Sequence, residues 1–170
     1  NARERIDADM TSGSAAVGLA SLGGGVGIAN VRSQARAYID DDIPGHTSSI
    51  NAAGNVDISA SLDEKTLNQA FAGGLSAFVS VSGAVSYIDN DYLVDAHIGK
   101  NVAINRADTV SVSARSSTDD KAKSLEGTIS GLMPIGVSYA EVDSDGSTSA
   151  YADDGVRIGT SEEGTVNSLD

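Results

Sequence analysis

The chain has no cysteine and no tryptophan, only two prolines, and few aromatic residues, which make up 4% of the sequence. The absence of cysteine excludes a disulfide scaffold, a thiolate metal site and a cysteine nucleophile. Aromatic side chains usually supply much of the area buried in a globular core. With so few of them, the 170 residues are expected to form a narrow core of valine, isoleucine, leucine and alanine.

Basic residues are scarce as well. The sequence has 11 lysine and arginine residues against 24 aspartate and glutamate residues, so the formal net charge is −13. Such a surface repels phosphates and lacks the clustered cations that nucleic-acid binding requires. We therefore expect no nucleic-acid partner. The acidity is compatible with solubility in an exposed place and with cation binding.

Long hydrophobic runs are missing. The segment closest to a membrane span covers residues 14–31 and consists mostly of glycine, alanine and serine, and a related stretch returns at residues 70–88. We therefore interpret it as part of a repeat and expect no membrane span. Residues 1–7 are charged and have no apolar stretch of the kind found in signal peptides. We expect the chain to be an internal fragment of a longer polypeptide.

What the sequence does contain is a repeat. Similar segments start at Ala37, Ala96 and Ala150, which are 59 and 54 residues apart. Residues 54–61 match residues 108–115 in the same way, and each repeat carries a glycine-rich apolar run between these landmarks. We therefore expect one continuous array over residues 1–170, made of a partial repeat (1–60), a repeat (61–114) and a partial repeat (115–170).

Apolar and polar residues alternate within each repeat, which is the pattern of a strand with one buried face. One alternative stays open, since residues 63–72 could form a short helix. The apolar members of the alternation are expected to face the interior: Val56, Ile58, Ala60, Leu75, Ala77, Val79, Val81, Ala96, Ile98, Val102, Ile104, Val110, Val112 and Ala114.

A repeat of 54 to 59 residues is short for an immunoglobulin-like sandwich, which needs about 100 residues. Short strands joined by turns rich in glycine, asparagine and aspartate fit an all-β fold, a β-solenoid of the parallel β-helix type. If each coil takes about 20 residues, one repeat forms two to three coils. Backbone pairing between coils leaves open edges at both ends. We therefore expect self-association end to end or side by side, or covalent continuation into further repeats.

The sequence predicts no catalytic, cofactor-binding or metal-binding residues. The only histidines are His46 and His97. His97 lies near Asp95, but no Gly-x-Ser-x-Gly nucleophile elbow is present. His97 also takes the position of Tyr38 and Tyr151 in the sister repeats, so we interpret it as an outward strand position. The two tyrosines are expected to form an outward stacked ladder, with a carbohydrate platform as the alternative.

Acidic clusters recur along the chain: Asp40, Asp41 and Asp42; Asp89, Asp91 and Asp95; Asp143, Asp145, Asp153 and Asp154. Residues 143–147 resemble the opening of a calcium loop. However, position 154 holds aspartate where an EF-hand closes with glutamate, and the nonapeptide array of calcium-loaded roll proteins is absent. We expect the aspartates to cap turns and keep the surface soluble, and Ca²⁺ binding is the alternative.

Residues 23–61 resemble the repeat of giant bacterial surface proteins of the filamentous-haemagglutinin type, and they are most similar to the leukotoxin-type filamentous adhesins. The units of that family run as a glycine-rich apolar stretch, an Ala-Tyr-Ile-Gly-Asp-like strand and a Gly-Asn-Val-x-Val-x-Ala-like strand. Residues 83–114 and 136–159 fit the same frame. The chain departs from the pattern at Asp40, at Pro44 and His46, and in the acid-rich insert at residues 143–147.

The resemblance implies an extracellular β-solenoid shaft on the bacterial cell surface. Such a shaft is exported as part of a giant polypeptide, gives reach, serves attachment between cells or to surfaces, and is not an enzyme. Two alternatives remain. One is a module that binds glycans or host matrix through the serine, threonine and tyrosine surface. The other is a polysaccharide-degrading β-helix enzyme, although such enzymes carry their acids and bases on loops that break the repeat, and no long irregular insertion occurs here.

Overall fold

The computed structural model describes residues 1–41, 43, 45–159 and 166–169. The described residues form an all-β fold in which every strand pairing is parallel, so the predicted fold class is confirmed. The strands are β1 (Ala2–Ile39), β2 (Ser48–Asn51), β3 (Val56–Ile98), β4 (Val102–Ser130), β5 (Met133–Ala152), β6 (Arg157–Ile158) and β7 (Val166–Leu169).

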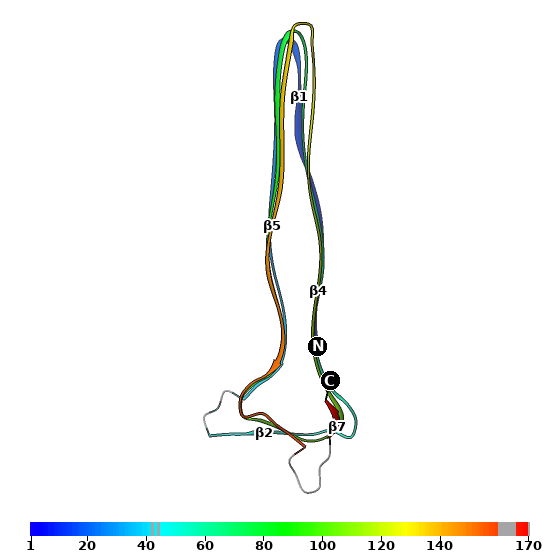
Figure 1. The fold of residues 1–170 in the computed structure, drawn as a ribbon, viewed down its shortest axis with the longest axis vertical. Helices are drawn as coiled ribbons and strands as arrows, with labels where there is room; N and C mark the ends of the chain where they lie inside the picture. The colour runs from blue at the N-terminus through cyan, green and yellow to red at the C-terminus, as the bar shows by residue number, and fades with distance from the viewer. Residues whose placement is uncertain (42, 44, 160–165, 170) are drawn as a thin grey trace.

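Each repeat forms one tall coil. Strands β1 and β3 ascend one side of the molecule, turn at a distal tip and descend the other side, and short strands cross the base (Figure 1). Ala2 pairs with Ala60, and Ala60 pairs with Ala114, one coil further on. The expectation of two to three coils per repeat is therefore wrong. The glycine-rich runs do not turn the chain every 20 residues, because Gly23 and Gly25 continue as extended strand within β1.

The coils stack in register. Ala37 pairs with Ala96, and Ala96 with Ala150, as the repeat alignment predicts. The first coil accommodates its extra residues at the base, where residues 40–47 connect β1 to β2 and only residues 99–101 make the matching connection in the second coil. Positive φ angles of 81° at Gly45 and 59° at Asn101 help the chain to turn at these corners. Asp42 and Pro44 of the sequence analysis lie outside the described residues.

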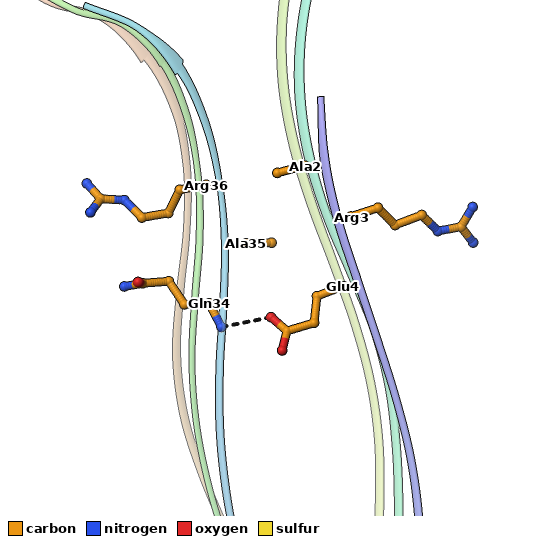
Figure 2. A pocket seen from close by; sticks show the side chains of 6 residues that line it. All are labelled: Ala2, Arg3, Glu4, Gln34, Ala35 and Arg36. Atoms are coloured by element: carbon orange, nitrogen blue, oxygen red, sulfur yellow. Dashed lines mark hydrogen bonds between the residues drawn. The ribbon is translucent and has the colours of Figure 1, made fainter.

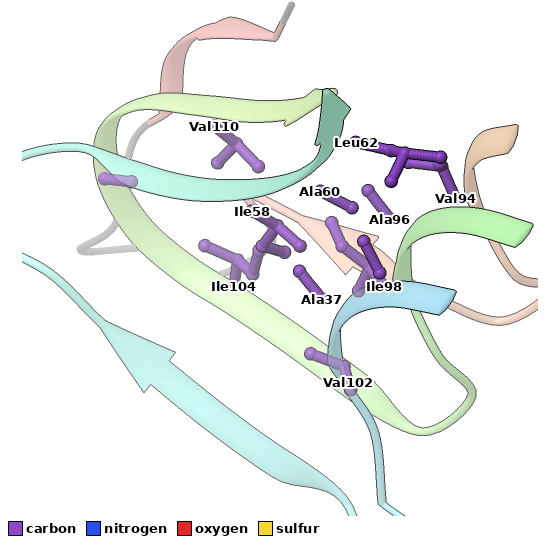
Figure 3. Packing of buried hydrophobic residues seen from close by; sticks show 12 residues of the cluster. Ala37, Ile58, Ala60, Leu62, Val94, Ala96, Ile98, Val102, Ile104 and Val110 are labelled. Atoms are coloured by element: carbon purple, nitrogen blue, oxygen red, sulfur yellow. The ribbon is translucent and has the colours of Figure 1, made fainter. Parts of the chain in front are cut away.

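The larger hydrophobic cluster occupies the basal half of the coils (Figure 3), and a small cluster of Ala70, Ala72 and Ala84 lies in the distal half. Ile98, Val102, Ile104 and Val110 are fully buried in the larger cluster, and Ile58 and Ala60 also belong to it. These positions confirm the inward face that the alternation predicts for the basal strands. Small side chains such as Ala96 fill the space between the two sides of the coil, which explains how the core forms with so few aromatic residues.

In the distal half, polar side chains face the interior and apolar side chains face outward, which is the reverse of the expected orientation. Ser76, Ser80 and Ser82 are buried, whereas Leu75 is half exposed and Val79 and Val81 share its outward phase. The expectation that Leu75, Ala77, Val79 and Val81 face the interior is therefore wrong.

The reason for the reversal is the close approach of the two sides of the coil. A Cβ atom on Gly25 would lie 2.2 Å from the backbone oxygen of Phe71, and one on Gly23 would lie 2.4 Å from the backbone oxygen of Gly73. Real Cβ contacts are not that short, so only glycine fits at these two positions, and small residues such as Ser76, Ser80 and Ala84 line much of the remaining distal interior. The large apolar side chains must then point outward.

Residues 63–72 form part of strand β3, so the short helix considered for them is wrong. Their alternation places Glu64, Thr66 and Asn68 inside the coil, in phase with the buried Leu62. Tertiary pairing with β1 and β4 on both sides stabilises the extended form. Within the described ranges, none of the secondary structure is a helix that could cross a membrane.

Candidate functional site

An aromatic stack on the outer face of the descending strands is the first candidate site. Tyr38 of β1, His97 of β3 and Tyr151 of β5 occupy equivalent positions in the three coils. Ring centroids lie 5.2 Å apart for Tyr38 and His97 and 5.0 Å apart for His97 and Tyr151, with interplanar angles of 5° and 7°. The predicted ladder is confirmed. His97 is nevertheless buried, because the two tyrosine rings cover both of its faces.

Asp95 organises the polar side of this stack. Its carboxylate lies 2.8 Å from Nδ1 of His97, accepts a hydrogen bond of 2.9 Å from Oγ of Ser149, and lies 3.6 Å from Nε of Arg36. Ser149 therefore donates to the carboxylate and not to the imidazole, which is not the arrangement in which a histidine takes the proton of a serine. Burial and the nearby carboxylate of Asp95 raise the pKa of the Tyr151 hydroxyl.

The acidic clusters lie mostly on strands. Residues 143–147 are extended within β5 and do not form a calcium loop, and Asp89 and Asp91 pair with Asp143 and Asp145 on neighbouring coils. Nη2 of Arg32 lies 2.8 Å from Oδ2 of Asp89, and Nε of Arg32 lies 3.7 Å from Oδ2 of Asp91. In the part of the chain that the structure describes, no group of three or more histidine and acidic side chains is arranged to hold a metal ion.

Asp41 does cap a turn, as expected for the aspartates. It accepts hydrogen bonds from the backbone N–H of Ile43 at 3.1 Å and from Oγ of Ser48 at 2.9 Å, and it contacts the ring of His46. The hydrogen bond with His46 lowers the pKa of the Asp41 carboxyl. His46 therefore stabilises the corner between β1 and β2.

A polar cluster inside the coils is the feature that sequence reasoning missed. Glu64 is 1% exposed and accepts hydrogen bonds from Oγ of Ser33 at 3.1 Å and from Oγ1 of Thr66 at 3.3 Å. Nearby, Nδ2 of Asn90 donates to Asp120 over 2.7 Å. Burial raises the pKa of Glu64, and the charges of Asp120 and Glu4 raise it further. The sequence did indicate that Glu64 faces the interior, because the alternation of the strand places it on the same face as Ala60 and Leu62.

Glu64→Gln is expected to stabilise the protein at neutral and alkaline pH. A carboxyl whose pKa is raised by folding favours the folded state while protonated, and that advantage is lost as the pH rises from about 4.3, the unfolded value, through the raised folded value. The melting temperatures of the variant and the parent should therefore be equal below pH 4, and the difference between them should grow as the pH rises above that value. Asp63→Asn, which removes an exposed carboxylate on the same strand, is the matched control. A constant difference at all pH values would contradict the prediction.

A pocket of about 410 Å³ lies at the free side of the first coil and is lined by Ala2, Arg3, Glu4, Gln34, Ala35 and Arg36. Ala2, Glu4 and Ala35 point into the space between the two strand segments, whereas Arg3 and Arg36 point away from it (Figure 2). The backbone N–H of Gln34 donates to Oε2 of Glu4 over 2.9 Å. The pocket is therefore the open end of the solenoid interior.

No family model matches the chain, and no curated protein or solved structure matches it.

Proposed function

We propose that the chain is a structural repeat segment of a secreted bacterial cell-surface fibre or adhesin, which serves attachment between cells or to surfaces. The observation that supports this proposal is the stack of in-register coils, one per repeat, in which, among the described strands, β1 and β5 each pair with β3 alone. Another coil can add to either long edge through the same parallel pairing. The proposal assigns no enzymatic activity to the chain.

The coil geometry bears on how such a fibre gains reach. Adjacent strands lie about 4.8 Å apart, so each repeat of about 54 residues lengthens the array by only that distance while its height stays constant. The array is a tall ribbon, and long reach needs many repeats, which fits a giant polypeptide or end-to-end self-association. Side-by-side association would use the broad outer faces.

Surface location is the property to test first. Antibodies raised against the chain should label intact bacteria that carry its gene, and external protease should remove the label. A cytoplasmic protein of the same cells, which is labelled only after permeabilisation, is the control. If the chain too is labelled only after permeabilisation, the proposal is wrong.

A glycan- or matrix-binding module is the second candidate, and the stack of Tyr38, His97 and Tyr151 favours it. The outer faces of Tyr38 and Tyr151 remain available, since these residues are 58% and 42% exposed, and aromatic faces beside Arg36 and Asp95 suit sugar rings.

If the stack binds ligand, Tyr38→Ala combined with Tyr151→Ala is expected to weaken binding to immobilised glycans or matrix about tenfold, because each aromatic contact contributes about 0.5–1.5 kcal/mol. Binding is measured by surface plasmon resonance. The control is Tyr139→Ala, which removes an exposed tyrosine elsewhere on β5. Unchanged binding by the double variant would rule out the stack as the contact surface.

A further inference from the structure

The distal half of the coils carries an apolar outer surface, which we call the apolar band. It comprises the outward-facing residues of the distal half, among them Val26, Phe71, Phe78, Ile129, Ile135 and Val137. Val26, Phe78 and Val137 are 62%, 52% and 66% exposed. Monomeric soluble proteins rarely expose a continuous apolar surface of this kind. We propose that the apolar band inserts into the hydrocarbon region of a lipid bilayer, a property that goes beyond the proposed role in attachment.

The apolar band is free of outward charge. Residues 10–31 and 66–88 contain no charged side chain, and residues 124–140 contain one, Glu126. Glu126 is partly buried between the strands, where it accepts hydrogen bonds from Ser82 at 3.1 Å and Thr128 at 3.0 Å. The other charged residues of the described ranges lie nearer the base. The surface thus divides at one level of the coil, as expected for a protein that meets hydrocarbon above that level and water below it.

The shape of the apolar band favours lipid over a second copy of the chain. The band covers the ascending side at Phe71 and Ile129, the tip at Phe78, and the descending side at Val26 and Val137. A protein partner docked on one face would leave the opposite face and the tip in water. Lipid surrounds all three at once.

The height of the apolar band matches the thickness of the lipid layer. The runs 10–31, 66–88 and 124–140 pass over the tip, so about 8 to 11 residues on each side separate the tip from the band's lower limit, which corresponds to about 26–36 Å at about 3.3 Å per residue. The hydrocarbon core of a bilayer is about 30 Å thick. Tyr87 and Tyr139 lie at the lower limit, and Tyr139 donates to Glu141 in the charged part of β5. Tyrosine is enriched at this level of membrane proteins because its ring is apolar and its hydroxyl is polar.

Most polar side chains that pack inside the band have hydrogen-bond partners, as hydrocarbon requires, and Oγ of Ser76 and of Ser130, near the tip, are the exceptions among the described residues. Oγ of Ser21 lies 2.8 Å from Oγ of Ser80, Nδ2 of Asn68 donates to the backbone oxygen of Tyr87 over 2.9 Å, and Oγ of Ser124 donates to that of Ala84 over 2.7 Å. The backbone groups on the free long edges also need partners in lipid, and a second copy of the chain would supply them through the same parallel edge pairing.

Site-specific labelling tests the insertion, since the chain has no cysteine of its own. Ile129→Cys places a polarity-sensitive fluorophore in the band, and Ser117→Cys places it on the same face of β4 nearer the base. With neutral phosphatidylcholine vesicles, we expect a blue shift and at least a twofold rise in emission at position 129 and no change at position 117. Neutral lipid is chosen because the net charge of −13 would oppose binding to anionic lipid.

Vesicle flotation with matched lysine variants provides the second measurement. Val137→Lys should weaken vesicle binding at least tenfold, because a cation in hydrocarbon is strongly disfavoured. Ser147→Lys, in the charged part of the same strand β5, adds the same charge and should leave binding unchanged. Both residues are exposed, so circular dichroism is expected to show the parent fold in each variant.

Three results would overturn the proposal. The first is no spectral change at position 129 with vesicles. The second is an equal change at positions 129 and 117, which would mean that the band is not the inserted part. The third is a blue shift at position 129 that needs no vesicles and grows with protein concentration, which would show that a second copy covers the band. None of these results bears on surface labelling of intact cells, so the proposed function is tested separately.

Discussion

Ile98→Ala is expected to lower the free energy of unfolding by about 2–5 kcal/mol, the usual range for truncating a fully buried isoleucine. Ile98 is 0% exposed on β3 and belongs to the basal cluster that includes Ile58 and Ile104. It pairs with Ile39 in the first coil and with Ala152 in the third, so the truncation leaves a cavity that three coils share. The coils are held in register by strand pairing on both sides and cannot collapse easily around that cavity.

Urea unfolding followed by far-ultraviolet circular dichroism measures this effect. Ile129→Ala is the matched control because it makes the same substitution at a residue that is 68% exposed. A change within about 0.5 kcal/mol is expected for the control in aqueous buffer. Equal losses for the two variants would contradict the placement of the hydrophobic core at the base.

Gly25→Val is expected to lower the free energy of unfolding by about 1–3 kcal/mol or more, as overpacking of a tight interior does. A Cβ at this position would lie 2.2 Å from the backbone oxygen of Phe71 and 3.2 Å from Cα of Gly13. Both obstacles are backbone atoms, so the strain cannot be relieved by moving a side chain. The two sides of the coil must separate, which breaks the interior contacts of the distal half.

The adjacent glycine gives the control. A Cβ on Gly24 would meet nothing within 4 Å, so Gly24→Val should leave the stability unchanged or raise it slightly, because valine suits a strand better than glycine. Urea unfolding of the two variants side by side provides the measurement. Similar stabilities for Gly24→Val and Gly25→Val would mean that the distal strands do not approach each other as closely as the structure has them.

The parts of the fold that depend on strand periodicity and repeat alignment were predictable. The alignment of Ala37, Ala96 and Ala150 correctly placed these residues above one another. The same alignment predicted a ladder of Tyr38 and Tyr151 and gave His97 the equivalent position, and in the structure His97 stacks between the two tyrosines. Both results follow from local sequence, because parallel pairing at a fixed repeat brings equivalent positions together.

The direction in which the distal residues face was not predictable from alternation alone. A period of two shows that Leu75 and Ser76 point to opposite sides, but it does not say which side is the interior. Hydrophobicity favoured Leu75 inside, whereas the close approach of Gly25 to the backbone of Phe71 excludes large side chains there. That approach depends on how two distant strand segments face each other. The number of coils per repeat was missed because each coil was expected to take about 20 residues, whereas the height of a coil depends on long-range strand pairing.

The interior polar cluster was missed because acidic residues were assigned to turns and solvent. Glu64 follows the inward phase of β3 and could have been identified by extending the alternation from Ala60 and Leu62. The serine that donates a hydrogen bond to Asp95 could not have been identified from the sequence, because the sequence contains many serines. The structure identifies Ser149, because β5 lies beside β3 at that height.

The in-register stacking of coils also constrains how the repeats can differ in evolution. Asp7 pairs with Lys65, and Lys65 with Asp119, so the sign of the charge alternates from one coil to the next. The hydrogen bond from Lys121 lowers the pKa of Asp119, and the charge of Lys65 lowers it further. An exact duplication of one unit would instead place identical charges about 4.8 Å apart in a continuous column. Divergence between tandem copies at such positions relieves this repulsion, and where identical charges do pair, as Asp89 and Asp143 do, the cation of Arg32 lies beside them.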